Sequence, residues 1–253
     1  MRFENKVVIV TGAASGIGFA TAMRFAEEGA RLVLVDRNSE QLHKAKKKIT
    51  QKFSSSVSLF CFDISREGEV KECINNVVRD LGSIDVLFNN AGGGAPKKLI
   101  EDLTYEDWQN VVDANLTGTF LCSQEAIKIM KNQSPMGGRI INNGSISAYA
   151  PRPDSAPYTA TKHGVSGLTK SISLDGRKYN IACSQIDIGN AATDMTERMK
   201  KGVPQANGST MVEPTFDVNH VAEVVVNISN FPLETNVQFI TIMATKMPFI
   251  GRG

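Results

Sequence analysis

Short apolar runs alternate with amphipathic stretches along the whole chain, and this alternation restricts the fold more than any other feature of the sequence. Residues 7–10 and 32–35 are runs of Val, Ile and Leu bounded by turn or polar residues, which is typical of strands buried on both faces. Residues 17–28 between them carry apolar side chains at helical spacing, and Gly29 follows as a typical helix C-cap. The beginning of the chain therefore predicts a strand, a helix and a second strand.

The same alternation continues to the end of the chain. Further strands are predicted at residues 57–62, 84–88, 139–143, 181–187 and 237–243. Further helices are predicted at residues 39–51, 67–81, 105–131, 157–178 and 218–229. Strands that alternate with helices require a parallel sheet covered on both faces, because right-handed crossovers leave few other topologies. We therefore expect an α/β protein with a doubly wound Rossmann fold, a seven-stranded parallel sheet and helices on both faces.

No segment rich in Pro, Gly or Ser divides the chain, so residues 1–253 are expected to form one domain. The one long irregular segment lies at about residues 189–216, where Gly202, Pro204, Gly208 and Pro214 interrupt any regular pattern. Loops of this size inside a compact domain usually have a function. We predict that this insertion is a lid over a substrate site.

Composition and charge exclude several classes of protein. The 28 basic and 26 acidic residues give a net charge of +2, which argues against a dedicated nucleic-acid binder. The four cysteines form no CxxC pair, so no metal site is predicted. No apolar run approaches the roughly 18 residues that a membrane helix needs. We therefore expect a cytoplasmic protein that binds no membrane.

The sequence T-G-A-A-S-G-I-G at residues 11–18 lies between the first predicted strand and the first predicted helix. Glycines let the backbone turn sharply and approach a pyrophosphate, and the N-terminus of the helix offers free N–H groups and positive charge. The loop therefore predicts a single NAD(P)-binding domain. Its predicted cofactor contacts are Gly12, Ser15, Gly16, Ile17 and Gly18.

Asp36 stands at the end of the second predicted strand. A carboxylate at this place accepts hydrogen bonds from the adenosine ribose and repels a 2′-phosphate. Arg37 beside it complicates the choice of cofactor, since a guanidinium group can hold a 2′-phosphate. Because Ser15 supplies no second cation, we expect NAD as the cofactor, with NADP less favoured.

Tyr158 and Lys162 are four residues apart at the start of a predicted helix, so both side chains project from one face. An ammonium ion about 4 Å from a phenol, at an effective dielectric constant near 20, favours the phenolate by ~4 kcal/mol. Such a pair is common by chance. Ser145 at the end of the preceding predicted strand makes it a candidate catalytic site, because a hydroxyl group there can hold a substrate oxygen.

Together these motifs resemble the short-chain dehydrogenase/reductase (SDR) family, of the single-domain type of about 250 residues, over essentially the whole chain. The resemblance rests on T-G-A-A-S-G-I-G at 11–18, Asp63, N-N-A-G at 89–92, Asn115, Ser145 and Y-T-A-T-K at 158–162. It implies that Tyr158 is the general acid/base and that Lys162 assists it and binds the nicotinamide ribose. It also implies that Ser145 polarises the substrate oxygen and that Asn115 holds a water that passes protons from Lys162 to solvent.

The resemblance also implies further contacts, with Asp63 and Ile64 at the adenine and Ser147 at the substrate. The implied contacts along the rest of the cofactor are Asn90, Ala91, Gly92, Gly189, Ala191 and Thr193. The chain departs from the family pattern at Ile188, where proline is usual, and this exchange is expected to loosen the turn. We interpret Arg152, near the candidate serine, as a surface arginine rather than a partner for an acidic substrate.

The predicted function is hydride transfer between a nicotinamide cofactor and a carbonyl or secondary alcohol. The alternative is a non-catalytic protein that senses NAD(H), which has no need of all four catalytic residues. An epimerase or dehydratase on a related fold usually has a tighter glycine loop and a longer substrate domain. Sugars, steroids, acyl thioesters and small ketones all stay open as substrates, because the fold does not determine them.

The end of the chain is unusually apolar, with Met247, Pro248, Phe249 and Ile250 where termini are normally polar. Family members similar to this chain are commonly tetramers with two-fold axes, and their C-termini meet at one interface. We therefore expect a homotetramer in which Phe249 and Ile250 lie at a subunit contact near the neighbouring lid. The alternative is a tail folded back on its own subunit.

Overall fold

The main sheet of the protein has seven strands that all run parallel. The computed structural model describes residues 1–250, and in chain order the strands are β1 (Val7–Thr11), β2 (Arg31–Asp36), β3 (Val57–Cys61), β4 (Val86–Asn89), β5 (Gly138–Asn143), β6 (Ile181–Gly189) and β9 (Phe239–Met243). Their spatial order is β3-β2-β1-β4-β5-β6-β9. The order reverses between β1 and β4, so the carboxyl ends of these two strands form the switch point where such sheets bind ligands. The predicted doubly wound Rossmann fold is confirmed.

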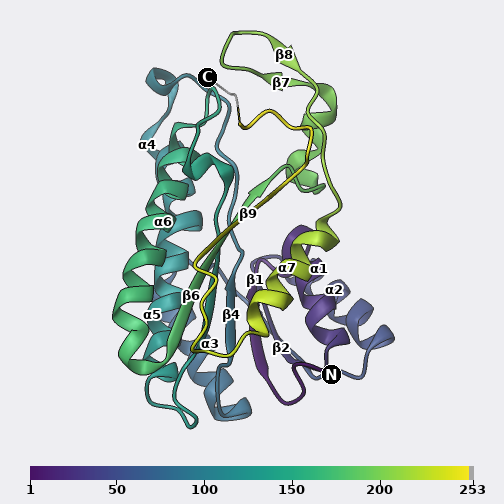
Figure 1. The fold of residues 1–253 in the computed structure, drawn as a ribbon, viewed down its shortest axis with the longest axis vertical. Coiled ribbons are helices and arrows are strands. Elements are labelled where there is room, and N and C mark those ends of the chain that lie inside the picture. The colour runs from purple at the N-terminus through teal and green to yellow at the C-terminus, as the bar shows by residue number, and fades with distance from the viewer. Residues whose placement is uncertain (251–253) are drawn as a thin grey trace.

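Helices cover both faces of this sheet, as Figure 1 shows. One face packs against α1 (Gly16–Glu27), α2 (Ser39–Lys52) and α7 (Val218–Ser229). The other packs against α3 (Glu67–Leu81), α5 (Gly118–Met130) and α6 (Ala156–Gly176). In β1, Val8 and Val10 enter the first core while Val7 and Ile9 enter the second. Burial on both faces is the reason that β1 is apolar from Val7 to Val10.

The prediction of one continuous helix at residues 105–131 is wrong, because the structure divides this range into three elements. It consists of α4 (Tyr105–Val112), a π-helical turn at Asp113–Thr117, and α5. Asn115 lies inside the π-helical turn, and its side chain bonds both the backbone N–H (2.7 Å) and the carbonyl oxygen (3.0 Å) of Gly93. The wider turn accompanies this contact with the loop after β4, at a place where π-helical turns often mark function.

The predicted lid at 189–216 is more regular than expected. It contains a 3₁₀ helix, η5 (Asp194–Lys201), and an antiparallel pair, β7 (Val203–Pro204) with β8 (Thr210–Met211). Figure 1 shows this pair projecting beyond one end of the main sheet. Shorter 3₁₀ helices are η1 (Ile100–Asp102), η3 (Ile146–Ala148) and η4 (Arg177–Tyr179). Whether the segment acts as a lid stays a prediction.

The apolar tail packs against its own subunit, which was the alternative expectation. Met247 is buried with Ile146 and Ala244, and the ring of Phe249 lies 6.3 Å from that of Tyr149 in an edge-on arrangement. Ile250 is exposed. The subunit contact predicted for Phe249 and Ile250, and the homotetramer itself, stay predictions. Over the described residues, no helix is both long enough and apolar enough to cross a membrane.

Candidate active site

The loop after β1 has the backbone geometry that a phosphate site needs. Gly12 has a φ of +63°, and a Cβ atom there would lie 2.8 Å from the Cα atom of Ala91. No larger residue fits this position. Ser15 is the N-cap of α1 and its side chain makes no capping hydrogen bond, so the hydroxyl group and the helix N–H groups are free to bind an anion.

Two adjoining cavities run from this loop along the carboxyl ends of the strands. The first is lined by predicted cofactor residues: Gly12, Ser15, Gly16, Ile17, Asp36, Asn90, Ala91, Gly92, Tyr158, Lys162, Ala191 and Thr193. The second shares Gly12, Asp36, Ala91 and Gly92 with it and adds Arg37, Asp63 and Ile64. We call the two together the cofactor cleft. The structure thus brings 15 of the 17 predicted cofactor residues into one continuous cleft.

The other two predicted contacts lie elsewhere. Gly18 lines neither cavity, and a Cβ atom on it would collide with the carbonyl oxygen of Gly12. Its glycine therefore serves the close packing of α1 against the loop. Gly189 lines the pocket on the other side of Tyr158 rather than the cleft.

The N-N-A-G segment braces the strands beside the cleft, as predicted. The hydroxyl oxygen of Thr11 accepts hydrogen bonds from the backbone N–H groups of Asn90 (2.9 Å) and Ala91 (3.0 Å). The Asn90 side chain donates to the carbonyl oxygen of Thr11 (3.1 Å) and accepts from Asn143 (2.9 Å). These bonds tie β1, β4 and β5 together where the cleft opens.

Two carboxylates stand at the far end of the cleft. Asp36 accepts hydrogen bonds from the backbone N–H groups of Ala14 (3.1 Å) and Asn38 (3.0 Å), which hold it at the cavity wall. Asp63 accepts from the N–H (3.0 Å) and hydroxyl (2.9 Å) groups of Ser65. The backbone hydrogen bond from Ser65 is the largest cause that lowers the pKa of Asp63. Both side chains are therefore fixed before any ligand arrives.

Three of the four predicted catalytic residues, Ser145, Tyr158 and Lys162, line neighbouring parts of the site. Tyr158 lines both the cofactor cleft and a neighbouring pocket, and Ser145 lines that pocket too. The Nζ atom of Lys162 lies 5.5 Å from the centre of the Tyr158 ring and donates to the carbonyl oxygen of Asn143 at 2.7 Å. The backbone N–H of Ser147 donates to the Ser145 Oγ atom (3.1 Å), so the serine proton is free for another partner.

Asn115 lies behind this group and lines neither the cleft nor the pocket. Besides Gly93, its side-chain amide reaches the hydroxyl oxygen of Thr161 (3.3 Å), which in turn donates to the carbonyl oxygen of Tyr158 (2.8 Å). Asn115 thus connects the loop after β4 with the helix that carries Tyr158. Its predicted role of holding a water stays a prediction.

Asp187, in β6, is a site residue that sequence reasoning missed. Its carboxylate is fully buried and accepts from the backbone N–H of Ser145 (2.9 Å), the hydroxyl group of Tyr149 (2.8 Å) and the amide of Gln185 (2.7 Å). Burial raises the pKa of Asp187, while these hydrogen bonds and the charge of Lys162 act in the opposite direction. A carboxylate inside a strand predicted to be buried was the signal that could have revealed it.

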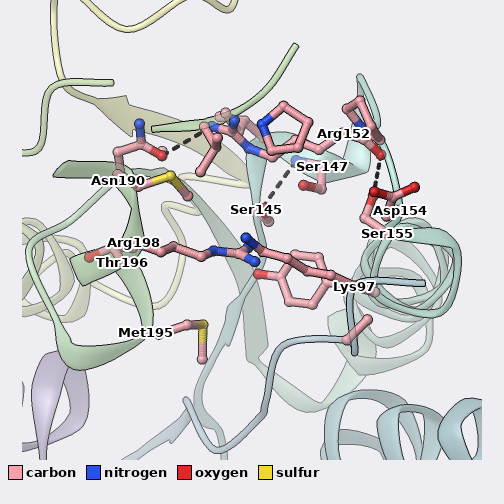
Figure 2. A pocket seen from close by; sticks show the side chains of 18 of the residues that line it. Lys97, Ser145, Ser147, Arg152, Asp154, Ser155, Asn190, Met195, Thr196 and Arg198 are labelled. Atoms are coloured by element: carbon pink, nitrogen blue, oxygen red, sulfur yellow. Dashed lines mark hydrogen bonds between the residues drawn. The ribbon is translucent and has the colours of Figure 1, made fainter. Parts of the chain in front are cut away.

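The neighbouring pocket, which we call the substrate pocket, is shown in Figure 2. It contains the predicted substrate contacts Ser145, Ser147 and Tyr158. Met195 and Met199 of η5 form part of its wall. The predicted insertion therefore contributes directly to this pocket.

Arg152 is not the surface arginine that we predicted. Its side chain is 13% exposed and forms two hydrogen bonds with the buried Glu213, of 2.7 and 2.5 Å. Asn190 also donates to Glu213 (2.8 Å). Although burial raises the pKa of Glu213, hydrogen bonds from Arg152, Gln205 and Asn190 lower it to about 2. The partners are 61 residues apart in sequence, so no local pattern reveals the pair.

The turn after β6 is held firmly although proline is replaced by Ile188, contrary to our expectation. The strand continues as far as Gly189, which pairs with Met243 of β9. A Cβ atom on Gly189 would lie 2.7 Å from the sulfur of Met247 and 2.8 Å from the Cβ of Met243. Pairing with β9 and packing by the tail thus take the place of the restriction that proline supplies.

Comparison with known proteins agrees with this geometry. The family model described as short chain dehydrogenase matches residues 6–204. The chain is 39% identical over 197 residues to a 3beta-hydroxysteroid dehydrogenase of Mediterraneibacter gnavus, covering 78% of this chain and 70% of that protein. The crystal structure of levodione reductase is similar with a TM-score of 0.86 at 30% identity, covering 95% of this chain and 96% of that one. A metagenomic short-chain oxidoreductase in complex with NADP shares the fold, with a TM-score of 0.82 at 24% identity over 97% of this chain and 99% of that one.

These similarities extend along most of the chain and confirm the resemblance inferred from the motifs. They give no support to the alternative of a non-catalytic NAD(H) sensor. The protein is an oxidoreductase that acts on CH–OH groups and transfers hydride between a nicotinamide cofactor and an alcohol or ketone. Because the family model matches well over half of its residues, the chain belongs to the short-chain dehydrogenase family.

Proposed function

We propose that Tyr158 is the general acid/base of this hydride transfer and acts where the cofactor cleft meets the substrate pocket. When bound in the cleft, the nicotinamide supplies or accepts the hydride. Tyr158 exchanges a proton with the substrate oxygen, and the positive charge of Lys162 stabilises the phenolate form. The free proton of Ser145 donates to the same oxygen, where negative charge develops. The observation that carries this assignment is the position of Tyr158 in the walls of both cavities.

The test replaces the two central groups one at a time. Tyr158→Phe is expected to lower kcat at least a hundredfold while NADH affinity changes little, because only the proton donor is lost. Lys162→Ala is expected to lower both kcat and NADH affinity, because the lysine also forms part of the cleft wall. Turnover is followed by NADH absorbance and binding by NADH fluorescence. Retention of more than about a tenth of the activity by Tyr158→Phe, a loss below ~1.4 kcal/mol, contradicts the assignment.

The proposed substrates are cyclic secondary alcohols and ketones. Similar proteins are named for such compounds: a 3beta-hydroxysteroid dehydrogenase and levodione reductase. The apolar side chains in the substrate pocket suit a carbocyclic body. The test assays a panel of cyclic, open-chain and sugar ketones for NADH consumption. Cyclic ketones are expected to be reduced with the highest kcat/KM. Exclusive reduction of open-chain or sugar ketones contradicts the proposal.

The proposed cofactor within the nicotinamide class is NAD, on the ground of Asp36. Its carboxylate stands fixed in the part of the cleft expected to take the adenosine ribose, where it repels an added phosphate. Arg37 in the same wall favours NADP, and two structurally similar proteins are complexes with NADP or 5-hydroxy-NADP, so NADP has equal standing in the comparisons. The affinities for NADH and NADPH are compared by fluorescence titration of the unaltered protein and of Asp36→Ala. Tighter binding of NADPH by the unaltered protein contradicts the proposal.

The proposed assembly is a homotetramer. Exposed aromatic side chains on α4 and α5, namely Tyr105, Trp108 and Phe120, support contact between these helices of neighbouring subunits. Light scattering at several protein concentrations measures the mass. A monomer at all concentrations contradicts the proposal. The cytoplasmic location stays a prediction.

A further inference from the structure

The wall of the substrate pocket combines apolar side chains with positive charge. Ile146, Met195, Met199 and Val203 supply much of its apolar surface. Lys97, Arg152 and Arg198 also line it, and Asp154 is the one acidic residue among the lining residues in the described part of the chain. Arg152 is largely buried and needs a partner within the chain, whereas Lys97 and Arg198 are exposed and keep their charges available to a ligand.

The charge of Arg152 is already neutralised within the protein. Its guanidinium group forms two hydrogen bonds with the buried carboxylate of Glu213 and a third with Asn190 (3.2 Å). This pair joins the loop after η3 to the end of the insertion and is therefore structural. Arg152 has no need of an acidic ligand.

Lys97 and Arg198 differ from Arg152 in this respect. Within residues 1–250, neither side chain forms an ion pair or a hydrogen bond. Their neighbours in sequence do: Lys98 pairs with Asp107 (2.6 Å) and Lys200 with Glu197 (2.9 Å). Lys98 and Lys200 thus have acidic partners, whereas the two cations that line the pocket, which are also exposed, have none among residues 1–250.

Figure 2 shows how the two unpaired side chains lie. Arg198 extends from η5 and Lys97 from the loop after β4, and they enter the pocket from opposite sides and point toward one another. Asp154 lies at the edge of the view beside Ser155. Two like charges that point toward one another repel, and an anion between them relieves the repulsion. A guanidinium group also binds a carboxylate through two parallel hydrogen bonds.

We propose that the substrate carries a carboxylate, which Lys97 and Arg198 bind while its carbonyl or hydroxyl group lies at Tyr158 and Ser145. The inference rests on the proposed function and specifies its substrate class as an apolar oxo or hydroxy acid. All four side chains line the same pocket, so one small molecule can reach both pairs. The phosphate of an NADP ribose is not the ligand of this pair, because Asp36 and Arg37 line a different cavity that contains neither cation.

The test compares matched ligands that differ only in charge: 3-(4-oxocyclohexyl)propanoate and its methyl ester. The unaltered protein is expected to prefer the acid by at least tenfold in kcat/KM. Arg198→Met and Lys97→Met are each expected to lower this preference about tenfold, mainly through the KM of the acid. Lys98→Met and Lys200→Met remove neighbouring cations outside the pocket and are the matched controls, expected to keep the preference unchanged.

A second measurement separates this inference from the proposed reaction. Calorimetric titration of acid and ester into the NADH-saturated protein measures binding without turnover. Tighter binding of the acid that is lost in Arg198→Met supports the carboxylate site even if neither ketone is reduced, in which case only the proposed reaction fails. Equal affinity for acid and ester in the unaltered protein, or an equal loss of preference in Lys200→Met, overturns the carboxylate site.

Discussion

Replacing Arg152 by Met tests how strongly the Arg152–Glu213 pair stabilises the protein. The side chain of Glu213 is 0% exposed, and its pKa is lowered from 4.5 to about 2 although burial acts against ionisation. A shift of this size corresponds to about 3 kcal/mol in favour of the ionised form. Removing the cation of a buried pair costs a similar ~3–5 kcal/mol, because the buried carboxylate loses the positive charge and the two hydrogen bonds that favour its ionised form. We expect Arg152→Met to lower the free energy of unfolding at pH 7 by about 3 kcal/mol.

The assay is urea denaturation without ligands, at one fixed protein concentration. Arg152→Met/Glu213→Gln, which also removes the buried negative charge, should recover more than half of the loss. The loss in Arg152→Met should also shrink as the pH falls, because Glu213 without the Arg152 charge takes up a proton more readily. Lys44→Met, which breaks the exposed pair with Glu40, is the control and should change stability little. A loss in Arg152→Met no larger than in this control, or independent of pH, refutes the reasoning.

Three further predictions concern other parts of the site. Asp187→Ala removes the acceptor of three hydrogen bonds, from the backbone N–H of Ser145, the hydroxyl group of Tyr149 and the side-chain amide of Gln185, so it should cost at least ~2 kcal/mol of stability and lower kcat, measured by denaturation and turnover. Glu213 takes up its proton near pH 4.5 in the unfolded protein and only near pH 2 in the folded protein. The contribution of its ionised form to the free energy of unfolding is therefore complete above pH 4.5 and is lost as the pH falls toward 2. Glu213→Gln should flatten the dependence of stability on pH over this range. Gly12→Ala meets Ala91 and a φ of +63°, so NADH affinity should fall at least tenfold in a fluorescence titration, and unchanged affinity would show that the loop is not the phosphate site.

The sequence predicted the centre of the sheet well because strands such as β1 and β2 are buried on both faces and therefore appear as continuous apolar runs. It also predicted the meeting of Tyr158 and Lys162, because four residues make one helical turn. The break in the helix at 105–131 was not predictable in this way. It accompanies the contact of Asn115 with Gly93, which lies 22 residues earlier. Periodicity within a helix carries no information about such a partner.

The site residues that sequence reasoning missed also have partners that are distant in sequence. Asp187 acts on Ser145 across 42 residues, and Arg152 finds Glu213 across 61. Motif spacing describes residues that act within one element or one turn, whereas these pairs join different elements. The unpaired state of Lys97 and Arg198 is also invisible in sequence. The nearby Lys98 and Lys200 are also basic residues, but in the structure they form ion pairs with Asp107 and Glu197.

The end of β6 connects the proposed catalytic residue Ser145, the tail and the insertion within four residues. Asp187 accepts a hydrogen bond from the backbone N–H of Ser145, and Gly189 lies against Met247 of the tail. Asn190 forms hydrogen bonds with both Arg152 and Glu213. Asn190 and Glu213 lie near the two ends of the proposed lid, and Arg152 binds both. Opening at those ends would separate the buried carboxylate of Glu213 from Arg152, and Gln205 of the β7–β8 turn also bonds this carboxylate, so movement of the lid is expected in η5. Arg198 and Met195 lie in that part, so the same motion would admit the ligand and bring the cation of Arg198 onto it.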